Sequence, residues 1–185
     1  MDIKKLIRGC KKNNLKSQSD LYNLYKDTLY MSCLKYCSDT SEAQDNLHDS
    51  FMEIFKNIKK YNGNGSFEGW MKRITINKAI NKYKKKKPVY IDIKNDILED
   101  TSIEEDKLNL DLDTILNCIQ QLPNQYRLVF NLYELDDYSH KEIANLLSIS
   151  ENTSKSNLHR AKIILKQKIE EKMQLQTKKQ VKYGN

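Results

Sequence analysis

Residues 61–87, YNGNGSFEGWMKRITINKAINKYKKKK, join a glycine-rich polar turn to a basic segment that begins with aromatic side chains. Glycine reaches positive backbone angles at low cost, so the turn Asn62-Gly63-Asn64-Gly65 lets backbone donors curve around a small flat group such as an extruded base. Ser66 is expected to cap the helix that follows, whose lysines and arginine supply the positive charge that a phosphate backbone needs. The stretch is therefore typical of a surface that binds single-stranded DNA.

The aromatic side chains of this stretch have two interpretations. Tyr61 and Tyr83 offer faces on which bases can stack. Phe67 and Trp70 lie one turn apart at the start of the helix, and Trp70 is expected mainly in the core. A run of lysines is commonly a solvated helix end. Because the turn, the aromatics and the charge coincide, DNA binding is the favoured interpretation for the segment as a whole.

Length and charge limit the possible classes of protein. The chain has 185 residues, of which 31% are charged, and its net charge is +7. Two small helical domains suit this composition better than one large core, and the charge favours nucleic acid or another anionic partner. We find no apolar run of membrane-spanning length and no signal-peptide pattern, so we expect a cytoplasmic protein without membrane insertion. The four cysteines and three histidines lack metal-ligand spacing, so no metal or cofactor is expected. No disulfide is expected either, because free buried thiols are the commoner state in a reducing compartment.

An amphipathic segment precedes the basic stretch. Its apolar residues fall at helical spacing and are Ala43, Leu47, Phe51, Ile54, Phe55 and Ile58. Asp45, Asp49 and Glu53 form an acidic ridge on another face, where like charges four residues apart repel one another mildly. The ridge therefore either binds a basic partner or is a solvated face near a helix N-terminus.

The composition changes abruptly at Pro88. Residues 88–107 are predominantly acidic and show no sustained helical pattern, which predicts a flexible linker. The linker separates a first domain, residues 1–87, from a second helical domain, residues 108–172. A basic polar tail is expected over residues 173–185.

Residues 139–162 carry the pattern of a helix-turn-helix. Ser139 and Glu142 fit a capping box for a short helix, residues 148–150 form the turn, and Ser150 caps a longer helix that begins ENTSKSNLHRAK. The second helix of such a motif enters the major groove by its N-terminal residues. Its donors suited to base edges and phosphates are Lys155, Ser156, His159 and Arg160. A plain helical hairpin is the alternative.

In this order and at this separation, these segments resemble the extracytoplasmic-function (ECF) group of bacterial sigma factors, the small relatives of sigma-70. Residues 45–61, DNLHDSFMEIFKNIKKY, are similar to the region 2 helix that grips the clamp helices of RNA polymerase. Residues 65–83, GSFEGWMKRITINKAINKY, are similar to the loop and helix that melt and read the minus-ten element. Residues 122–162, LPNQYRLVFNLYELDDYSHKEIANLLSISENTSKSNLHRAK, resemble region 4, which reads the minus-thirty-five element.

The resemblance implies roles for individual residues. The implied polymerase contacts are Asp45, Asp49 and Phe51. The loop that would pocket a flipped minus-ten base comprises Tyr61, Asn62, Gly63, Asn64 and Ser66, and the residues that would line the promoter strand are Arg73, Asn77, Lys78, Asn81 and Lys82. The implied minus-thirty-five contacts are Thr153, Lys155, Ser156, His159 and Arg160. Two positions depart from the family. Residue 152 is often glycine in relatives and is Asn here, which is a fair substitute in turn-like geometry. Residue 157 is often basic in relatives and is Asn here.

The sequence thus predicts an all-α protein in which two small helical domains, sigma region 2 and a helix-turn-helix sigma region 4, are joined by an acidic linker. Its predicted function is that of an alternative sigma factor that binds core RNA polymerase and directs promoter recognition, DNA melting and transcription initiation. Promoter DNA would be bound as duplex and as melted strand, and the resemblance also allows an anti-sigma factor. No enzymatic chemistry is expected, because the acidic residues lack partnered histidines or cysteines. The alternative, a helix-turn-helix regulator that binds duplex DNA without polymerase, leaves residues 61–87 unexplained.

Overall fold

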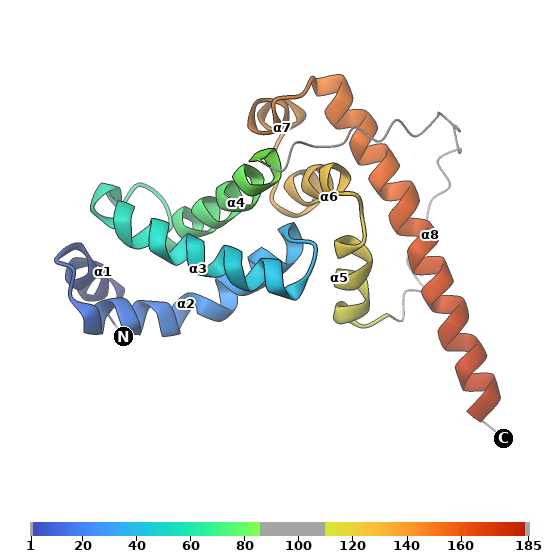
Figure 1. The fold of residues 1–185 in the computed structure, drawn as a ribbon, viewed down its shortest axis with the longest axis horizontal. Helices are drawn as coiled ribbons and strands as arrows, with labels where there is room; N and C mark the ends of the chain where they lie inside the picture. Colours follow the sequence, from blue (N-terminus) through green and yellow to red (C-terminus); the bar gives the residue numbers. More distant parts are fainter. Residues whose placement is uncertain (1, 86–109, 184–185) are drawn as a thin grey trace. The chain divides into compact units, whose positions relative to one another are not determined.

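The computed structural model describes residues 2–85 and 110–183, with side chains described as far as residue 174. All regular elements in these ranges are helices (Figure 1), which confirms the predicted all-α class. The chain divides into two compact units, residues 1–86 and 87–185. The predicted linker, residues 88–107, lies outside the described residues.

The first unit contains four α-helices and one short 3-10 helix. These are α1 (Ile3–Lys11), α2 (Leu15–Tyr36), α3 (Thr40–Asn57), η1 (Ile58–Lys60) and α4 (Phe67–Lys85). The side chains of Asp2, Asn14 and Asp39 accept hydrogen bonds from backbone N–H groups of the first turns of α1, α2 and α3. Ser66 is the cap predicted for α4, and its Oγ accepts from the Gly69 N–H at 3.3 Å.

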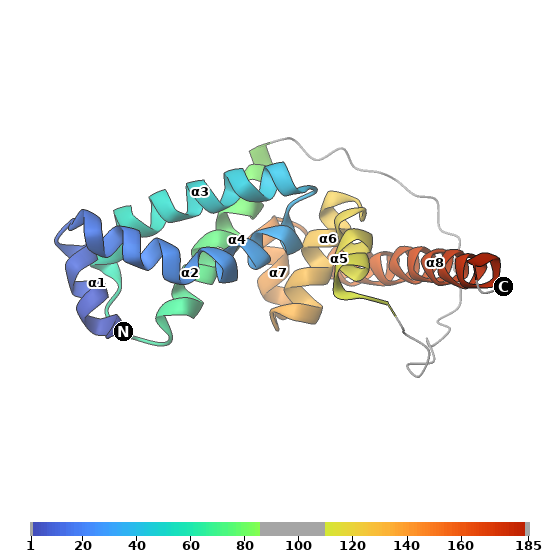
Figure 2. The same ribbon diagram turned by 90° about the horizontal axis from the view of Figure 1, so that it is seen from below.

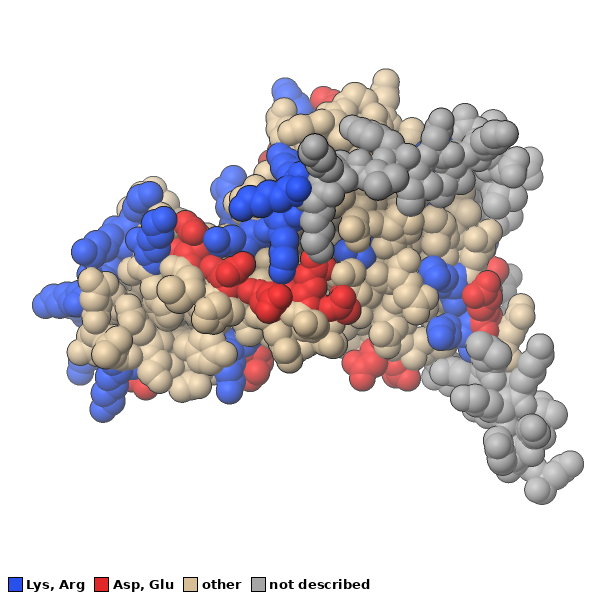
Figure 3. Space-filling view, in the orientation of Figure 1, with Lys and Arg blue, Asp and Glu red and all other residues tan. Residues whose placement is uncertain are grey.

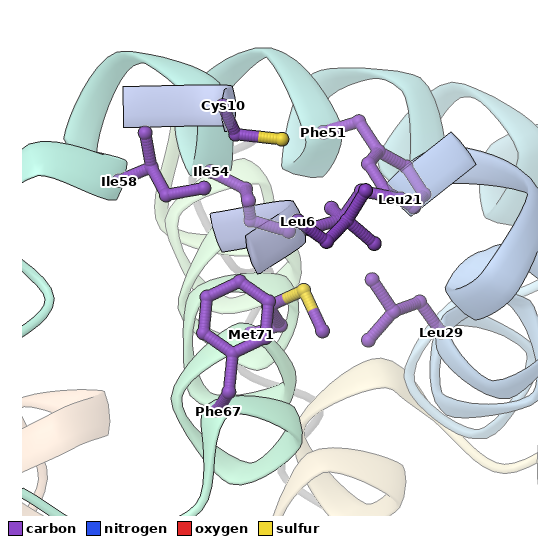
Figure 4. Packing of buried hydrophobic residues seen from close by; sticks show 9 residues of the cluster. All are labelled: Leu6, Cys10, Leu21, Leu29, Phe51, Ile54, Ile58, Phe67 and Met71. Atoms are coloured by element: carbon purple, nitrogen blue, oxygen red, sulfur yellow. The ribbon is translucent and has the colours of Figure 1, made fainter. Parts of the chain in front are cut away.

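One apolar cluster holds the helices of the first unit together. Figure 4 shows its side chains pointing toward one another from α1, α2, α3, η1 and α4. The buried members are Leu6, Cys10, Leu21, Leu29, Phe51, Ile54, Ile58, Phe67 and Met71. Phe51, Ile54 and Ile58 of this cluster belong to the apolar pattern predicted between residues 43 and 58. The predicted apolar face of this segment therefore faces the core.

A buried amide links three helices beside this cluster. Asn46 of α3 is 1% exposed. Its Nδ2 donates to the carbonyl oxygen of Thr75 in α4 at 3.2 Å and to Sγ of Cys33 in α2 at 3.4 Å. Burial raises the pKa of the Cys33 thiol to about 11, against a smaller opposing effect of the Asn46 hydrogen bond. Because a buried amide is costly without partners, Asn46 fixes the register of α2, α3 and α4.

Helix α1 is anchored to the rest of the unit at its C-terminal end. Gly9 approaches Ser17 of α2 so closely that a Cβ at position 9 would collide with the Ser17 hydroxyl. Lys11 Nζ donates to the carbonyl oxygen of Tyr61 at 2.6 Å, which ties α1 to the segment before α4. Figure 2 shows α1 lying against the N-terminal end of α2. The position of α1 relative to the Tyr61 segment is therefore fixed by direct contacts.

The second unit contains α5 (Leu112–Gln120), α6 (Asn124–Phe130), a π-helical turn η3 (Asn131–Leu135), α7 (His140–Leu147) and α8 (Glu151–Tyr183). Its buried cluster is Cys118, Ile119, Leu122, Tyr126, Ala161, Leu165 and Ile169. The segment predicted as a tail, residues 173–185, continues α8 as far as Tyr183. No helix in the described ranges is both long and apolar enough to span a bilayer.

The polar caps of the helix-turn-helix form as predicted. Ser139 and Glu142 make a complete capping box at the start of α7. Ser148 ends α7 in the left-handed conformation, with φ 58° and ψ 47°. The Ser150 Oγ accepts from the Thr153 N–H at 3.0 Å and caps α8. The turn between α7 and α8 is thus set by local hydrogen bonds and one left-handed residue.

We expect Asn46→Ala to lower the free energy of unfolding of the first unit by about 2 kcal/mol, because it leaves a cavity and removes the donor shared by α2 and α4. Trp70 is the only tryptophan and lies in this unit, so its fluorescence during urea unfolding measures the effect. The control is Asn23→Ala on the exposed side of α2, which should change the same quantity by no more than about 0.5 kcal/mol. Equal effects of both substitutions would contradict the role of Asn46.

Candidate promoter and polymerase interfaces

Residues 61–66 form a loop whose shape depends on two glycines. Gly63 has φ +89° and Gly65 has φ +82°, which confirms the prediction that this turn uses positive backbone angles. The Tyr61 hydroxyl donates to the Gly65 carbonyl oxygen at 2.9 Å, and the Asn64 N–H donates to Asn62 Oδ1 at 3.1 Å. The loop therefore closes on itself and leaves residues 62–66 exposed.

Tyr61 connects the loop to the aromatic side chains at the start of α4. The side chain is half-buried, and its ring centroid lies 4.9 Å from that of Phe67 and 5.4 Å from that of Trp70. Both its ring and its hydroxyl are thus engaged within the chain. The loop residues that face solvent are Asn62, Gly63, Asn64 and Ser66.

Helix α4 extends this surface away from the loop. Arg73, Asn77 and Asn81 follow one another at four-residue steps and lie on one side of α4. Arg73 and Asn81 are exposed, and Asn77 is half-buried. Trp70, one turn before Arg73, is half-buried and packs against the core cluster, which agrees with its predicted place mainly in the core.

The acidic ridge of α3 finds basic partners on α4. Glu53 lies 3.2 Å from Lys78 Nζ, and Asp45 lies 3.8 Å from Lys82 Nζ. The hydrogen bond from Lys78 lowers the pKa of the Glu53 carboxyl, and Asn57 adds to this effect. Figure 3 shows acidic side chains in a band over α3 and basic side chains beside it over α4. Asp49, between the two paired acids, is exposed on the same ridge.

The structure corrects the predicted role of Phe51 as a polymerase contact. Phe51 is 3% exposed and belongs to the core cluster. Its ring packs against Tyr22, with 4.7 Å between centroids, and against Phe55, with 5.9 Å. A ring this deeply buried offers a partner almost no surface, so Phe51 positions the α3 ridge from inside the domain.

The predicted contacts on α8 differ in exposure. Lys155, Ser156 and His159 are exposed, whereas Thr153 and Arg160 are half-buried. The Thr153 hydroxyl lies 2.8 Å from Ser150 Oγ, within the cap of α8. Asn152 is exposed in the first turn of α8, three residues before Lys155, so it is helical where turn-like geometry was expected. Asn157 is 5% exposed and faces inward.

His140 connects α7 to α8. Its Nδ1 lies 2.9 Å from Oγ of Ser154, which is fully buried, and its ring stacks on Tyr133 with 4.4 Å between centroids. Burial lowers the pKa of His140, and the neighbouring Lys155 charge lowers it further against the opposing effect of Glu151. The neutral imidazole is therefore the form that the folded second unit favours.

Comparison with known proteins identifies the family of the chain. Residues 21–89 match the family model for sigma-70 region 2, and residues 112–165 match that for sigma-70 region 4. The chain is 31% identical over 182 residues to the ECF RNA polymerase sigma factor SigW of Bacillus subtilis (strain 168). This alignment covers 91% of this chain and 97% of SigW. The chain belongs to the ECF sigma factors. The ECF sigma factor SigM of the same organism is 26% identical over 151 residues, covering 80% of this chain and 91% of SigM.

A solved structure shares the fold of this sigma factor. The sigma factor RpoE from Bartonella quintana, crystallised with the anti-sigma factor NepR, superposes with a TM-score of 0.52 at 18% identity and covers 84% of this chain and 98% of RpoE. The predicted function, an alternative sigma factor that directs promoter-specific transcription initiation, is confirmed by the family. Core RNA polymerase and promoter DNA are accordingly its partners. The alternative of a regulator that acts without polymerase is not favoured.

We expect the second unit of the sigma factor to lose thermal stability as pH falls through about 6.5, the ordinary pKa of histidine. The pKa of His140 is lowered in the folded state, so in this range the unfolded chain binds a proton more readily than the folded chain does. Below the lowered pKa of folded His140 the loss levels off. His140→Gln removes this contribution. The measurement is Tm by circular dichroism between pH 7.5 and 5.0, and the parent should fall further than the variant; parallel curves would contradict the assignment.

Proposed function

We propose that the two sequence-defined domains of this sigma factor divide promoter recognition between them. Residues 1–87 would bind core polymerase and the melted minus-ten strand, residues 108–172 would read the minus-thirty-five element, and residues 88–107 would link the two. The observation that carries the proposal is the exposed, self-closed loop 62–66 at the start of the basic helix α4. We further propose that the chain acts in the cytoplasm and contributes no catalytic chemistry of its own.

The minus-ten strand would follow α4 and end in the loop. The exposed amides of Asn62 and Asn64 and the backbone of Gly63 provide donors and acceptors for the edge of one flipped base. Ser66 lies at the end of this loop, while the Tyr61 hydroxyl keeps the loop in shape through its hydrogen bond to the Gly65 carbonyl oxygen. Along α4 the strand would contact Arg73, Asn77 and Asn81 directly, and Lys78 and Lys82 where they extend past the acidic ridge.

The minus-thirty-five element would be read by the first turns of α8. Lys155, Ser156 and His159 present exposed donors to the major groove. Asn152 adds an amide on the same side. Thr153 and Arg160 are half-buried, so we assign them to phosphates at the groove edge or to fixing the cap and the packing of α8.

Core polymerase would bind the α3 ridge. Asp49 is exposed between two carboxylates that already have lysine partners, so it is the ridge residue most available to a basic surface. Asp45 is also exposed and could exchange Lys82 for such a surface. The B. quintana RpoE structure was solved with the anti-sigma factor NepR. We propose that an anti-sigma factor likewise binds this chain.

We expect the double variant Asn62→Ala and Asn64→Ala to bind core polymerase normally but to form open promoter complexes about fivefold or more less well, since contacts to one captured base contribute roughly 1–3 kcal/mol. A genomic template pool transcribed by the reconstituted parent holoenzyme supplies the promoter. Permanganate reactivity of its thymines and transcript yield are measured on duplex templates and on templates with a bubble at the minus-ten element. The bubble should restore most of the transcription.

Lys155→Ala is the contrasting variant for this experiment. It should weaken binding to a duplex minus-thirty-five probe without changing permanganate reactivity at saturating holoenzyme, because α8 takes no part in melting. If the loop variant opens duplex promoters as well as the parent, residues 61–66 are only a connection between helices. In that case the minus-ten assignment is wrong.

We expect Asp49→Arg to abolish co-purification with core polymerase while the circular dichroism spectrum stays unchanged, because a reversed charge on the ridge repels a basic partner surface. Asp27→Arg on α2 is the matched control, since Asp27 is also an exposed carboxylate of the first unit. The control should co-purify with core enzyme. Normal co-purification of Asp49→Arg would place the polymerase contact elsewhere.

A further inference from the structure

Helix α1 carries a cationic surface that the roles assigned above do not use. It lies before residue 21, where the match to sigma-70 region 2 begins. Its exposed cations are Lys4, Lys5 and Arg8, its C-cap is exposed Lys12, and the neighbouring η1 adds exposed Lys59 and Lys60. Figure 3 shows blue side chains gathered at the end of the first unit where Figure 1 places α1. The apolar side of α1, with Leu6 and Cys10, is buried in the core.

The cationic surface is continuous with the loop 61–66. Lys4, Arg8 and Lys11 recur at steps of four and three residues and therefore share one edge of α1. Lys11 Nζ touches the Tyr61 carbonyl oxygen at 2.6 Å, so this edge borders the loop. Lys60 directly precedes Tyr61 along the chain. Successive cations on the edge are about 4.5 to 6 Å apart along α1, at a rise of about 1.5 Å per residue.

These cations are available to an external anion. In the described part of the chain, no carboxylate lies within ion-pair distance of Lys4, Arg8, Lys59 or Lys60. The one acidic residue of this segment, Asp2, turns its carboxylate to the Lys4 and Lys5 N–H groups as the cap of α1. The lysines 72, 78 and 82 of α4, by contrast, are each paired with a carboxylate. Among the described residues, α1 and η1 thus carry a group of neighbouring cations without carboxylate partners.

We propose that the edge of α1 formed by Lys4 and Arg8, together with Lys59 and Lys60 of η1, binds the phosphates of the unpaired promoter strand where it leaves the loop on the side away from α4. The inference rests on the proposed capture of a base by residues 62–66. Cations without exposed aromatic neighbours suit phosphates rather than base faces. A strand held on both sides of the flipped base cannot easily restack, so this surface would help to keep the promoter open.

The salt dependence of strand binding tests the proposal. Holoenzyme is reconstituted from core polymerase and the full chain, and it is titrated with a fluorescent single strand that extends on both sides of the minus-ten element. Each phosphate contact on a single strand adds about 0.7 to the slope of log Kobs against log salt concentration. The variant Lys4→Gln with Arg8→Gln should therefore flatten the slope by about 1.4 for two lost contacts.

Two controls make the result specific. Lys16→Gln with Lys26→Gln on α2 changes the net charge equally and should leave the slope unchanged. Trimming the strand on the side of the captured base away from α4 should remove the difference in slope between the α1 variant and the parent. Trimming the strand on the α4 side should preserve this difference. Unchanged Tm of the α1 variant shows that the fold is intact, as expected for two exposed side chains.

The outcomes separate this proposal from the one on which it rests. If the parent holoenzyme binds the strand and the α1 variant has the parent slope, the α1 surface is not a strand contact and base capture by the loop still stands. An equal slope change in the α2 control would show a general effect of net charge and would also overturn the proposal. Failure of the parent holoenzyme to bind the strand would overturn both proposals.

Discussion

The hydrogen bonds of the Asn46 amide set the geometry of the first unit. Apolar side chains alone allow helices to slide by a turn at modest cost, whereas a buried amide has to meet particular acceptors. Asn46 reaches a carbonyl oxygen of α4 and the thiol of Cys33 in α2 from its own position on α3. One register of the three helices satisfies it. That register brings Glu53 opposite Lys78 and Asp45 opposite Lys82.

The charges on α3 and α4 consequently form one system. Two acids of the ridge proposed to bind polymerase, Asp45 and Glu53, are partners of two lysines proposed to bind DNA, Lys82 and Lys78. Because these groups are about one-third exposed or more, each pair stabilises the fold by no more than about 1 kcal/mol. A polymerase surface or a phosphate can therefore replace either partner at little cost to the fold. The pairs also hold the lysine side chains in place, which reduces the entropy lost when they bind a strand.

Local signals in the sequence were sufficient for the elements and their caps, and insufficient for the side chains that long-range packing controls. The capping box at Ser139, the cap at Ser150 and the glycines at 63 and 65 act within four residues, so their patterns predict their structures. Phe51 was assigned to a polymerase contact by resemblance, although its place in the apolar pattern of α3 already favoured the core. Tyr61 is held by Phe67, Trp70 and Lys11, the last of them 50 residues away, and no local pattern contains that information.

The second unit presents its donors by a different physical route. Here the start of α8 is held by the Ser150 cap and by the contact of His140 with Ser154, while Ala161, Leu165 and Ile169 pack the following turns against α5 and α6. Rotation of α8 about its axis would break the polar contacts at one end and expose the apolar side chains at the other. Lys155, Ser156 and His159 are therefore fixed in direction before any DNA is bound. Since a preorganised surface loses less conformational entropy on binding, the fixed axis and rotation of α8 favour the proposed contacts of these three residues with base edges.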